Sequence, residues 1–412
     1  MRKVIINVCR FVFAGVFIFS GFVKLVDPLG FTYKIQDYLT AFGPFFETFS
    51  FLALPVSVLL SALEFLIGIN LLLGIYRKLT GILAVLFMVV MLPLTLYIAV
   101  FNPVTDCGCF GDAVIIDNWS TFYKNIFLSG IAVLLFVFRG DIIPFISNPN
   151  SRIAAGYTFL FAVLLSVYCY LNLPVIDFRP YKIGTYIPEQ MQIPEGAPTD
   201  EYKTTLIYEK EGVSREFTLE DYPADDPSWK FVDSKNELIS KGYEPPIHDF
   251  TITLIETGED ITEEVLQDTN YTFLLISYQL EKASLKNAQE INEMYDYTGR
   301  NGYSFYCLNA SSDPVIADYI RKTGARYPMA TTDGTTLKTV VRSNPGLVLL
   351  KNGTIINKWH YRNIPVFDIP LSESDLGTVP EPTAGKNTLV ASGILILPLL
   401  LIIVLDRKRR KE

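Results

Sequence analysis

The segment Asp106-Cys107-Gly108-Cys109-Phe110-Gly111-Asp112 is a short polar stretch between two long apolar runs, Leu79–Phe101 and Phe122–Phe138. An apolar run of about 20 residues is long enough to cross a membrane as a helix. The pattern therefore places two cysteines, separated by a single glycine, at the end of a membrane span. Packing alone does not explain two thiols at such a position.

Four further stretches have the length and composition of membrane spans. They are Val4–Val26, Phe51–Ile75, Ile153–Leu173 and Leu389–Leu405. The N-terminus begins Met1-Arg2-Lys3 like a signal peptide, but no small-residue cleavage site follows, so we expect the first run to be retained. A hydrophobic fraction of 50% is too high for an ordinary soluble chain. The sequence therefore predicts a six-span membrane protein.

Lysine and arginine residues gather at alternate ends of the six predicted spans. The residues are Arg2, Lys3, Arg10, Arg77, Lys78, Arg139, Arg152 and Arg407–Lys411. All of them fall on one side if six spans are correct, and the positive-inside rule makes that side cytoplasmic. We therefore expect both termini in the cytoplasm. Three segments then lie outside it: Asp27–Ser50, the Cys107–Cys109 loop, and residues from about 174 to 386.

The polar region between the fifth and sixth spans has an ordinary globular composition. It carries most of the net charge of -8, so no nucleic-acid partner is expected. Alternating apolar and polar residues predict a hairpin formed by Lys203–Glu209 and Ser214–Leu219. From His248 onward, strand and helix patterns alternate up to a hairpin that turns at Asn352-Gly353. This order predicts a mixed sheet flanked by helices.

The expected elements of this α/β region follow one another closely. The predicted strands are Phe250–Ile255, Tyr271–Ile276, Tyr303–Asn309, Gly346–Leu350 and Ile355–Trp359, and the predicted helices are Ala283–Tyr297 and Asp313–Thr323, with a short segment from there to Arg342. Both kinds of element are short and bounded by turn residues, as in a compact domain.

From Phe19 to Asp112 the chain resembles the DoxX-like membrane proteins, and more closely the MauE type associated with methylamine utilisation. The resemblance is carried by Ser20-Gly21-Phe22-Val23-Lys24, by Glu64-Phe65-Leu66-Ile67-Gly68 with Gly74, and by Cys107-Gly108-Cys109-Phe110-Gly111. It implies a four-helix domain in a bacterial inner membrane. It also implies a role in disulfide formation in an extracytoplasmic client or partner protein.

The segment His248–Ile364 resembles an extracytoplasmic, membrane-tethered thioredoxin-like domain, on its element order and on Asn344-Pro345-Gly346. The resemblance implies that Pro345 occupies the cis-proline position of that family. After the strand Tyr271–Ile276, however, residues 277–284 read Ser-Tyr-Gln-Leu-Glu-Lys-Ala-Ser and lack the family's Cys-x-x-Cys pair. Because a thiolate is the nucleophile of disulfide exchange, we expect this domain to bind a client or partner without reacting.

These patterns divide the chain into seven parts. They are a four-helix membrane domain (1–140), a fifth membrane helix with its lead-in (141–175), a connector with a β-hairpin (176–247), the thioredoxin-like domain (248–370), a linker (371–387), a C-terminal membrane helix (388–406) and a basic tail (407–412). The expected fold class is therefore a multi-pass α-helical membrane protein with an α/β thioredoxin-like domain.

Cys107 and Cys109 are the candidate catalytic residues. A bridge between them would close a very small ring, which geometry normally disfavours, although Gly108 relieves the backbone restriction. A strained bridge is more oxidising than a structural one, which favours a redox pair. A local structural bridge and a metal half-site are the alternatives. Few soft ligands lie nearby, so no metal site is predicted.

The other cysteines have simpler interpretations. Cys169 lies near the outer end of the fifth span, where it serves either as a resolving thiol for the pair or as a packing residue. Cys9 is at the cytoplasmic end of the first span. Cys307 lies on a predicted core strand and is expected to be an inert buried thiol.

Glu64 stands in the middle of the second span, where an ionisable group is costly and is usually paired or functional. Its expected partner is Lys24 or Asn70. One interpretation is a polar clamp that holds the bundle together, and the other is a proton or quinone-related site. The sequence contains no nucleotide, flavin or haem motif. No cofactor is therefore expected, with a membrane quinone left open.

The leading hypothesis is a membrane-embedded thiol–disulfide oxidoreductase component that acts on extracytoplasmic proteins. Redox equivalents would pass through Cys107 and Cys109, and the thioredoxin-like domain would bind the client. One alternative is a non-catalytic scaffold of the cell envelope. Another is a small-molecule or quinone-binding, transporter-like bundle that uses Glu64.

Overall fold

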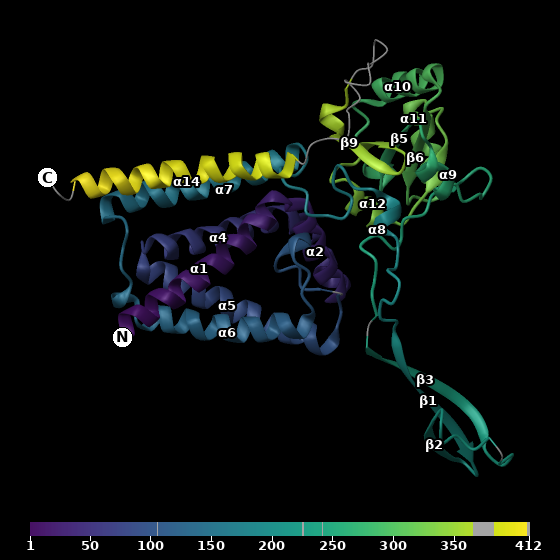
Figure 1. The fold of residues 1–412 in the computed structure, drawn as a ribbon, viewed down its shortest axis with the longest axis horizontal. Helices are drawn as coiled ribbons and strands as arrows, with labels where there is room; N and C mark the ends of the chain where they lie inside the picture. The colour runs from purple at the N-terminus through teal and green to yellow at the C-terminus, as the bar shows by residue number, and fades with distance from the viewer. Residues whose placement is uncertain (105, 225, 241, 366–382, 410–412) are drawn as a thin grey trace. The chain divides into compact units, whose positions relative to one another are not determined.

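The computed structural model describes residues 1–104, 106–224, 226–240, 242–365 and 383–409. The chain divides into two compact units, Met1–Gly184 with Thr251–Glu412, and Thr185–Phe250. The first unit contains long helices and an α/β domain, and the second contains a small antiparallel sheet (Figure 1). Most of the predicted linker and the end of the predicted basic tail, residues 371–382 and 410–412, lie outside the described residues.

Six helices in the described ranges are long and apolar enough to cross a membrane. They are α1 (Arg2–Val26), α4 (Ala53–Leu73), α5 (Arg77–Phe101), α6 (Asn118–Val137), α7 (Asn148–Leu171) and α14 (Thr383–Arg409). All six predicted spans are confirmed. Helix α6 begins four residues before its predicted start because the Asp117 carboxylate accepts a hydrogen bond from the Ser120 amide at 2.9 Å. Such a cap satisfies a backbone donor of the first turn.

Helices α1, α4, α5 and α6 form a bundle, and α7 and α14 run side by side (Figure 1). Two glycines allow α1 and α4 to approach closely. A methyl group on Gly21 would lie 2.7 Å from the Phe65 amide nitrogen, and one on Gly68 would lie 2.8 Å from the Ile18 backbone. Small residues at a helix crossing are typical of membrane bundles, where close packing drives association.

One end of this helical assembly gathers the start of α1, the α4–α5 and α6–α7 junctions and the end of α14. Arg2 forms an ion pair with Asp141. The fully buried Arg10 donates to backbone carbonyls at the end of α4 and in the segment before α7. Asp406 accepts hydrogen bonds from Ser147, next to the start of α7. We call this the basic end, and we call the end that carries the Cys107–Cys109 loop the cysteine end.

A shorter helix, α2 (Pro28–Ala41), follows α1 at the cysteine end. Its first turn is capped by Asp27, whose carboxylate accepts a hydrogen bond from the Gly30 amide at 2.9 Å. A single turn, α3 (Pro44–Glu47), and a 3-10 turn lead on into α4.

The α/β domain contains six strands in the order β4-β7-β6-β5-β8-β9. They are β4 (Thr253–Leu254), β5 (Tyr271–Ser277), β6 (Ser304–Asn309), β7 (Met329–Thr331), β8 (Gly346–Lys351) and β9 (Thr354–His360). Strands β5, β6 and β7 are parallel, whereas β8 is antiparallel to β5 and to β9. A parallel β-α-β unit extended by an antiparallel hairpin is the thioredoxin-like arrangement, so the predicted fold class is confirmed.

Helices pack on this sheet in the order of the chain. They are α9 (Thr262–Gln267), α10 (Ala288–Asn301), α11 (Asp313–Thr323) and α12 (Gly334–Val340). All seven residues of β5 are buried, which explains its continuous apolar sequence. The hairpin turn has positive φ at both Asn352 and Gly353, +48° and +69°. This is the conformation that the Asn-Gly dipeptide favours.

Three details of the α/β prediction are corrected. Strand β4 covers only two residues, because the Ile252 amide bonds to the Thr262 hydroxyl instead of to a neighbouring strand. Helix α10 begins at Ala288, five residues late, because the preceding segment is bound at the Ser284 amide to the Asn344 carbonyl. The segment before Arg342 contains β7 and α12, which were not predicted.

The second unit is a three-stranded antiparallel sheet in the order β2-β1-β3. Strands β1 (Glu201–Lys210) and β2 (Val213–Thr218) form the hairpin that the sequence indicates. Strand β3 (Lys230–Ser240) was not predicted, because polar residues interrupt its alternating pattern after Val232. A single helical turn, α8 (Ile187–Gln190), precedes the sheet.

Candidate functional site at the cysteine end

The loop between α5 and α6 brings the two sulfurs of the Cys-Gly-Cys sequence to 3.0 Å from each other. Gly108 makes this approach feasible, because its φ of +64° lies in the left-handed region that glycine adopts without steric cost. Cys107 is buried and Cys109 is partly exposed. A disulfide bond is about 2.05 Å long, so the sulfurs need to move together by only about 1 Å to form one.

An acidic side chain fixes the start of the loop. Asp106 accepts a hydrogen bond from the Gly108 amide at 2.7 Å, and its other oxygen lies 2.6 Å from the Lys34 ammonium group of α2. The Lys34 side chain also covers the glycine, since a methyl group at Gly108 would lie 3.1 Å from it. A larger residue at position 108 would therefore meet both a strained backbone and a steric conflict.

Two hydroxyl groups hold the cysteine carbonyls. The Tyr38 hydroxyl of α2 donates to the Cys107 carbonyl at 2.6 Å, and the Ser20 hydroxyl of α1 donates to the Cys109 carbonyl at 2.6 Å. Each cysteine backbone is thus bonded to a different helix, which leaves the thiol groups to interact with each other.

The two thiols differ in acidity. The hydrogen bond between the two sulfurs lowers the pKa of Cys109, and the positive charges of Lys124 and Lys24 act in the same direction against the opposing effect of burial. The pKa of Cys107 is raised, because its proton is shared with Cys109 and because it is buried. The first thiolate of the pair therefore forms on Cys109.

Lys124 helps to lower the pKa of Cys109, and we did not identify this residue as part of the site from the sequence. It lies on α6, with its ammonium group 4.3 Å from the centre of the Phe110 ring in the cysteine loop. The signal was present, since a lysine inside a predicted span is unusual and is often functional. The sequence did not show that this lysine lies near the thiols.

The buried charges in the membrane bundle form an ion pair. The Lys24 ammonium group of α1 lies 2.5 Å from the Glu64 carboxylate of α4, and each side chain is about 5% exposed. The Lys24 ammonium group also lies 5.0 Å from the centre of the Phe31 ring. Both charges are near enough to act on Cys109, where Lys24 lowers the pKa and Glu64 raises it.

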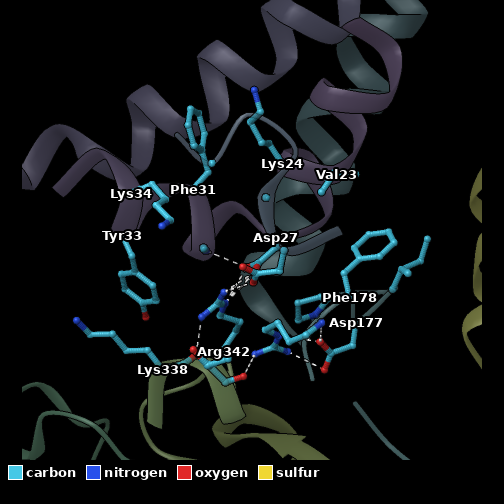
Figure 2. A pocket seen from close by; sticks show the side chains of 18 of the residues that line it. Val23, Lys24, Asp27, Phe31, Tyr33, Lys34, Asp177, Phe178, Lys338 and Arg342 are labelled. Atoms are coloured by element: carbon cyan, nitrogen blue, oxygen red, sulfur yellow. Dashed lines mark hydrogen bonds and ion pairs between the residues drawn. The ribbon is translucent and has the colours of Figure 1, made fainter. Parts of the chain in front are cut away.

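The thioredoxin-like domain contacts the cysteine end through Arg342 (Figure 2). Its guanidinium group lies 2.9 Å from the carboxylate of Asp27, which precedes α2, and 2.9 Å from that of Asp112, which follows the cysteine pair. Burial alone would lower the pKa of Arg342, but the two carboxylates outweigh it and raise the pKa. The arginine therefore stays charged and links the domain to the loop.

A cavity of about 210 Å³ lies where this domain meets the cysteine end. Its lining includes Lys24, Lys34, Gly108, Asp112, Lys338 and Arg342. Figure 2 shows side chains from α1, α2 and the α/β domain converging on it. On the same interface, the Tyr33 hydroxyl donates to the Tyr278 hydroxyl at 3.1 Å. The cavity thus joins the backbone of the thiol loop to the surface of the thioredoxin-like domain.

The peptide bond between Asn344 and Pro345, directly before β8, is cis. The Asn344 side chain accepts a hydrogen bond from the Ser277 hydroxyl at 2.7 Å and donates to the Gln279 carbonyl at 2.8 Å. The segment that follows β5 is therefore held against the cis-proline by polar contacts that involve no sulfur.

The remaining cysteines are Cys9, Cys169 and Cys307. Cys169 is buried and its sulfur is hydrogen-bonded to the Val175 backbone, and within the described residues no hydrogen bond joins it to Cys107 or Cys109. Cys307 is fully buried on β6. Over the same described ranges, no group of three or more His, Cys, Asp or Glu side chains is arranged to hold a metal ion.

Comparison with known proteins finds a family model for the membrane region. Residues 2–138 match the family described as methylamine utilisation protein MauE. Residues 202–241, which contain the three-stranded sheet, match a domain of unknown function, DUF8463. No curated protein matches the chain.

Solved structures similar to the chain come from proteins of low identity. A proposed protein disulfide isomerase from Bacteroides thetaiotaomicron is 16% identical, with 36% of this chain and 86% of that chain covered and a TM-score of 0.23. The thioredoxin domain of a thiol-disulfide oxidoreductase from Bacteroides vulgatus is 13% identical (26% and 81% covered, TM-score 0.23). The bacterioferritin comigratory protein of Xanthomonas campestris is 11% identical (35% and 89%, TM-score 0.21). The chain combines a membrane region that matches the MauE family with an α/β domain whose strand order is thioredoxin-like.

Proposed function

We propose that this protein is a membrane-embedded component of thiol–disulfide exchange and that Cys107 and Cys109 are its reacting pair. The observation that carries the proposal is the 3.0 Å approach of two thiols with unequal acidity in one short loop. A structural bridge alone gives no reason for the lysines and the buried ion pair around Cys109. The match of residues 2–138 to MauE supports a redox-related role.

In the oxidised form, a thiolate of a client protein attacks the sulfur of Cys109, which belongs to the more exposed residue of the pair. The bond between Cys109 and Cys107 breaks, and Cys107 leaves and takes up a proton. A second client thiolate then attacks the client sulfur of the mixed disulfide and releases Cys109 as a thiolate. The client loses two electrons and two protons, and the cysteine pair gains the electrons. A thiol of low pKa is the better leaving group, which suits Cys109 to the second step.

The thioredoxin-like domain would hold the client next to the loop without reacting itself. Residues 277–284 contain no cysteine, and the only cysteine of the domain, Cys307, is buried. Its polar segment beside Pro345 and its Arg342 contacts bring a protein-binding fold to the thiol loop. Client binding by this domain is therefore a part of the proposal that can be tested separately.

The proposed orientation places the cysteine end outside the cytoplasm of a bacterial cell and both termini inside. Arg2, Arg10, Arg77, Arg139 and Arg152 all belong to the basic end, and the positive-inside rule assigns that end to the cytoplasm. The thiol loop and the thioredoxin-like domain then share a compartment in which disulfides persist.

Thiol trapping in intact cells tests the proposal. Cells that carry the wild type, Cys107→Ser, Cys109→Ser or the double variant are quenched with acid and labelled with a maleimide reagent that adds mass. We expect the wild-type pair to shift between dithiol and disulfide when reductant is added and removed. In Cys107→Ser, the Cys109 thiolate should attack the disulfide of an already oxidised client and accumulate as a mixed disulfide, because no Cys107 thiol remains to release it. Cys109→Ser should form few mixed disulfides. Cys307→Ala is the matched control and should behave like the wild type.

The opposite result has a definite meaning. Two permanently reduced thiols, together with a double variant that has wild-type levels of oxidised client proteins, would remove the redox proposal. The scaffold function would then remain as the better account of a membrane bundle joined to a binding domain.

A further inference from the structure

The basic end of the membrane helices contains a second cavity, of about 780 Å³. Four cationic side chains line it, and its lining includes no aspartate or glutamate. The cations are Arg77, Lys78, Arg139 and Arg152. They come from the α4–α5 junction, the end of α6 and the first turns of α7. A concentration of one charge sign in a concave site attracts ligands of the opposite sign.

None of these four cations forms an ion pair within the described part of the chain. The guanidinium group of Arg77 donates to the Ile142 carbonyl at 3.0 Å, and that of Arg139 donates to the Phe136 carbonyl at 2.9 Å. These hydrogen bonds hold the two arginines in place and leave their charge uncompensated. Arg77 and Arg139 are half-buried and Lys78 and Arg152 are exposed, so all four charges can be reached by an anion from solution or from the lipid surface.

The acidic residues of the neighbouring elements are already engaged. Asp141 forms an ion pair with Arg2. Asp406 accepts hydrogen bonds from Ser147 and Asn150 at the start of α7. Both carboxylates are therefore bound to other groups and lie outside the lining of the cavity.

A helix N-terminus adds to the attraction. Helix α5 is 25 residues long, and its first residues, Arg77, Lys78 and Leu79, line the cavity. Its N-cap, Tyr76, gives no side-chain hydrogen bond to the first turn. Unsatisfied amides at the start of a long helix bind phosphate groups readily.

Apolar side chains complete the lining. Leu79, Ile82 and Ile146 lie beside the cations, and Leu79 is 55% exposed. The site thus combines positive charge with an apolar surface at the point where a membrane span begins. Phospholipids present this combination, with a charged head group next to acyl chains.

We propose that the basic end binds an anionic phosphate group, in contact with Arg77, Lys78, Arg139 and Arg152. An anionic phospholipid head group and free inorganic phosphate share this chemistry. The apolar lining and the position at the end of a span favour the phospholipid, and the two sources are separated by the experiment.

The experiment uses the full-length protein purified in a non-ionic detergent. Thermal unfolding is followed while dioleoylphosphatidylglycerol, dioleoylphosphatidylcholine or sodium phosphate is titrated at constant ionic strength. A ligand that binds only the folded protein raises the midpoint, and the rise gives an apparent affinity. We expect phosphatidylglycerol to raise the midpoint and phosphatidylcholine to leave it nearly unchanged. An equal rise with sodium phosphate would identify the free anion as the ligand.

Charge-removing variants locate the effect. The change Lys78→Gln or Arg152→Gln should weaken the apparent affinity about fivefold each, the effect expected for one basic residue at an anionic surface. Lys3→Gln, an exposed lysine of the same end that lies outside the lining, is the matched control and should keep wild-type affinity. Equal responses to both lipids and no response to phosphate, or full affinity in both variants, would overturn the proposal.

Discussion

The cysteine end of the membrane bundle and the thioredoxin-like domain use cysteine in opposite ways. In the bundle, two sulfurs lie 3.0 Å apart, and the pKa of Cys109 is lowered by Cys107 and by nearby lysines. In the domain, Cys307 is fully buried on β6, and burial raises its pKa to about 12. Reactivity follows the surroundings of a sulfur and not the name of the fold in which it lies.

The domain contributes charge to the pair's surroundings instead of sulfur. Arg342 connects the domain to Asp27 and Asp112, which both lie at the cysteine end. On the proposed function, the cysteine loop is the reacting part and the thioredoxin-like domain is the positioning part. Four changes test this division, beginning with the one of largest expected effect.

Breaking the buried ion pair of the bundle should have the largest effect. The change Glu64→Gln leaves the Lys24 charge buried without its partner, a loss of about 3–5 kcal/mol for a buried pair. Thermal unfolding in detergent measures it. The double change Lys24→Met with Glu64→Leu should recover most of the loss, because no charge is then left buried. A Glu64→Gln variant as stable as the wild type would show that the pair does not hold the bundle together.

Removing the ion pairs that link Arg342 of the thioredoxin-like domain to the cysteine end should have a smaller effect on stability. The change Arg342→Gln leaves the half-buried Asp27 and the exposed Asp112 without their cation, a loss of roughly 1–2 kcal/mol confined to the contact between domain and bundle. Hydrogen exchange followed by mass spectrometry should show faster exchange in α2 and α12. Arg321→Gln on α11, an exposed arginine paired with Asp318, is the matched control. Unchanged exchange in the Arg342 variant would remove the positioning role.

The difference in acidity between Cys109 and Cys307 can be tested further by a change at Lys124. A thiol reacts with iodoacetamide as the thiolate, so a lowered pKa lets Cys109 react at a lower pH than an ordinary cysteine. Lys124 favours the thiolate, and Lys124→Gln should raise the pKa and move the pH profile of alkylation upward. At neutral pH we expect alkylation to slow roughly threefold. Lys286→Gln, an exposed lysine of the α/β domain, should leave the profile in place. A downward shift would contradict the electrostatic account.

The smallest effect is expected in the domain's own cysteine. Cys307→Ala removes one buried sulfur, with a loss of about 1 kcal/mol from the small cavity that remains. The rate and pH profile of alkylation at the cysteine loop should not change. Mass spectrometry of the native wild type should find Cys307 unlabelled until the domain is unfolded. Rapid labelling of native Cys307 would remove the contrast between the two regions.

Local sequence patterns predicted much of the fold. Apolar runs gave the six spans, and Asn352-Gly353 gave a hairpin whose turn has the positive φ angles of that dipeptide. Strand β3 was missed because its polar residues hide the alternation, and α12 was missed because its seven residues are too few for a helical period to show. A prediction from hydrophobic periodicity needs a segment of sufficient length and a clear alternation of apolar and polar residues.

The surroundings of the site were less predictable. The sequence singled out Cys107 and Cys109, and it named Lys24 as a partner for Glu64. Arg342 could not be found in this way, because its partner Asp27 is 315 residues away in the chain. Such a contact depends on how two folded regions meet, which no local pattern records.

Helices α7 and α14 bear on how the thioredoxin-like domain works. The domain lies between these two helices in the chain, and the helices contact each other through the Tyr157 hydroxyl and the Ile394 carbonyl and through Asp406 with Ser147. The domain is therefore tethered to the membrane at both of its ends. Its effective concentration at the thiol loop is set by this double attachment and does not depend on the amount of protein in the cell. A client that binds the domain gains the same local concentration, so even weak binding would favour reaction at the loop.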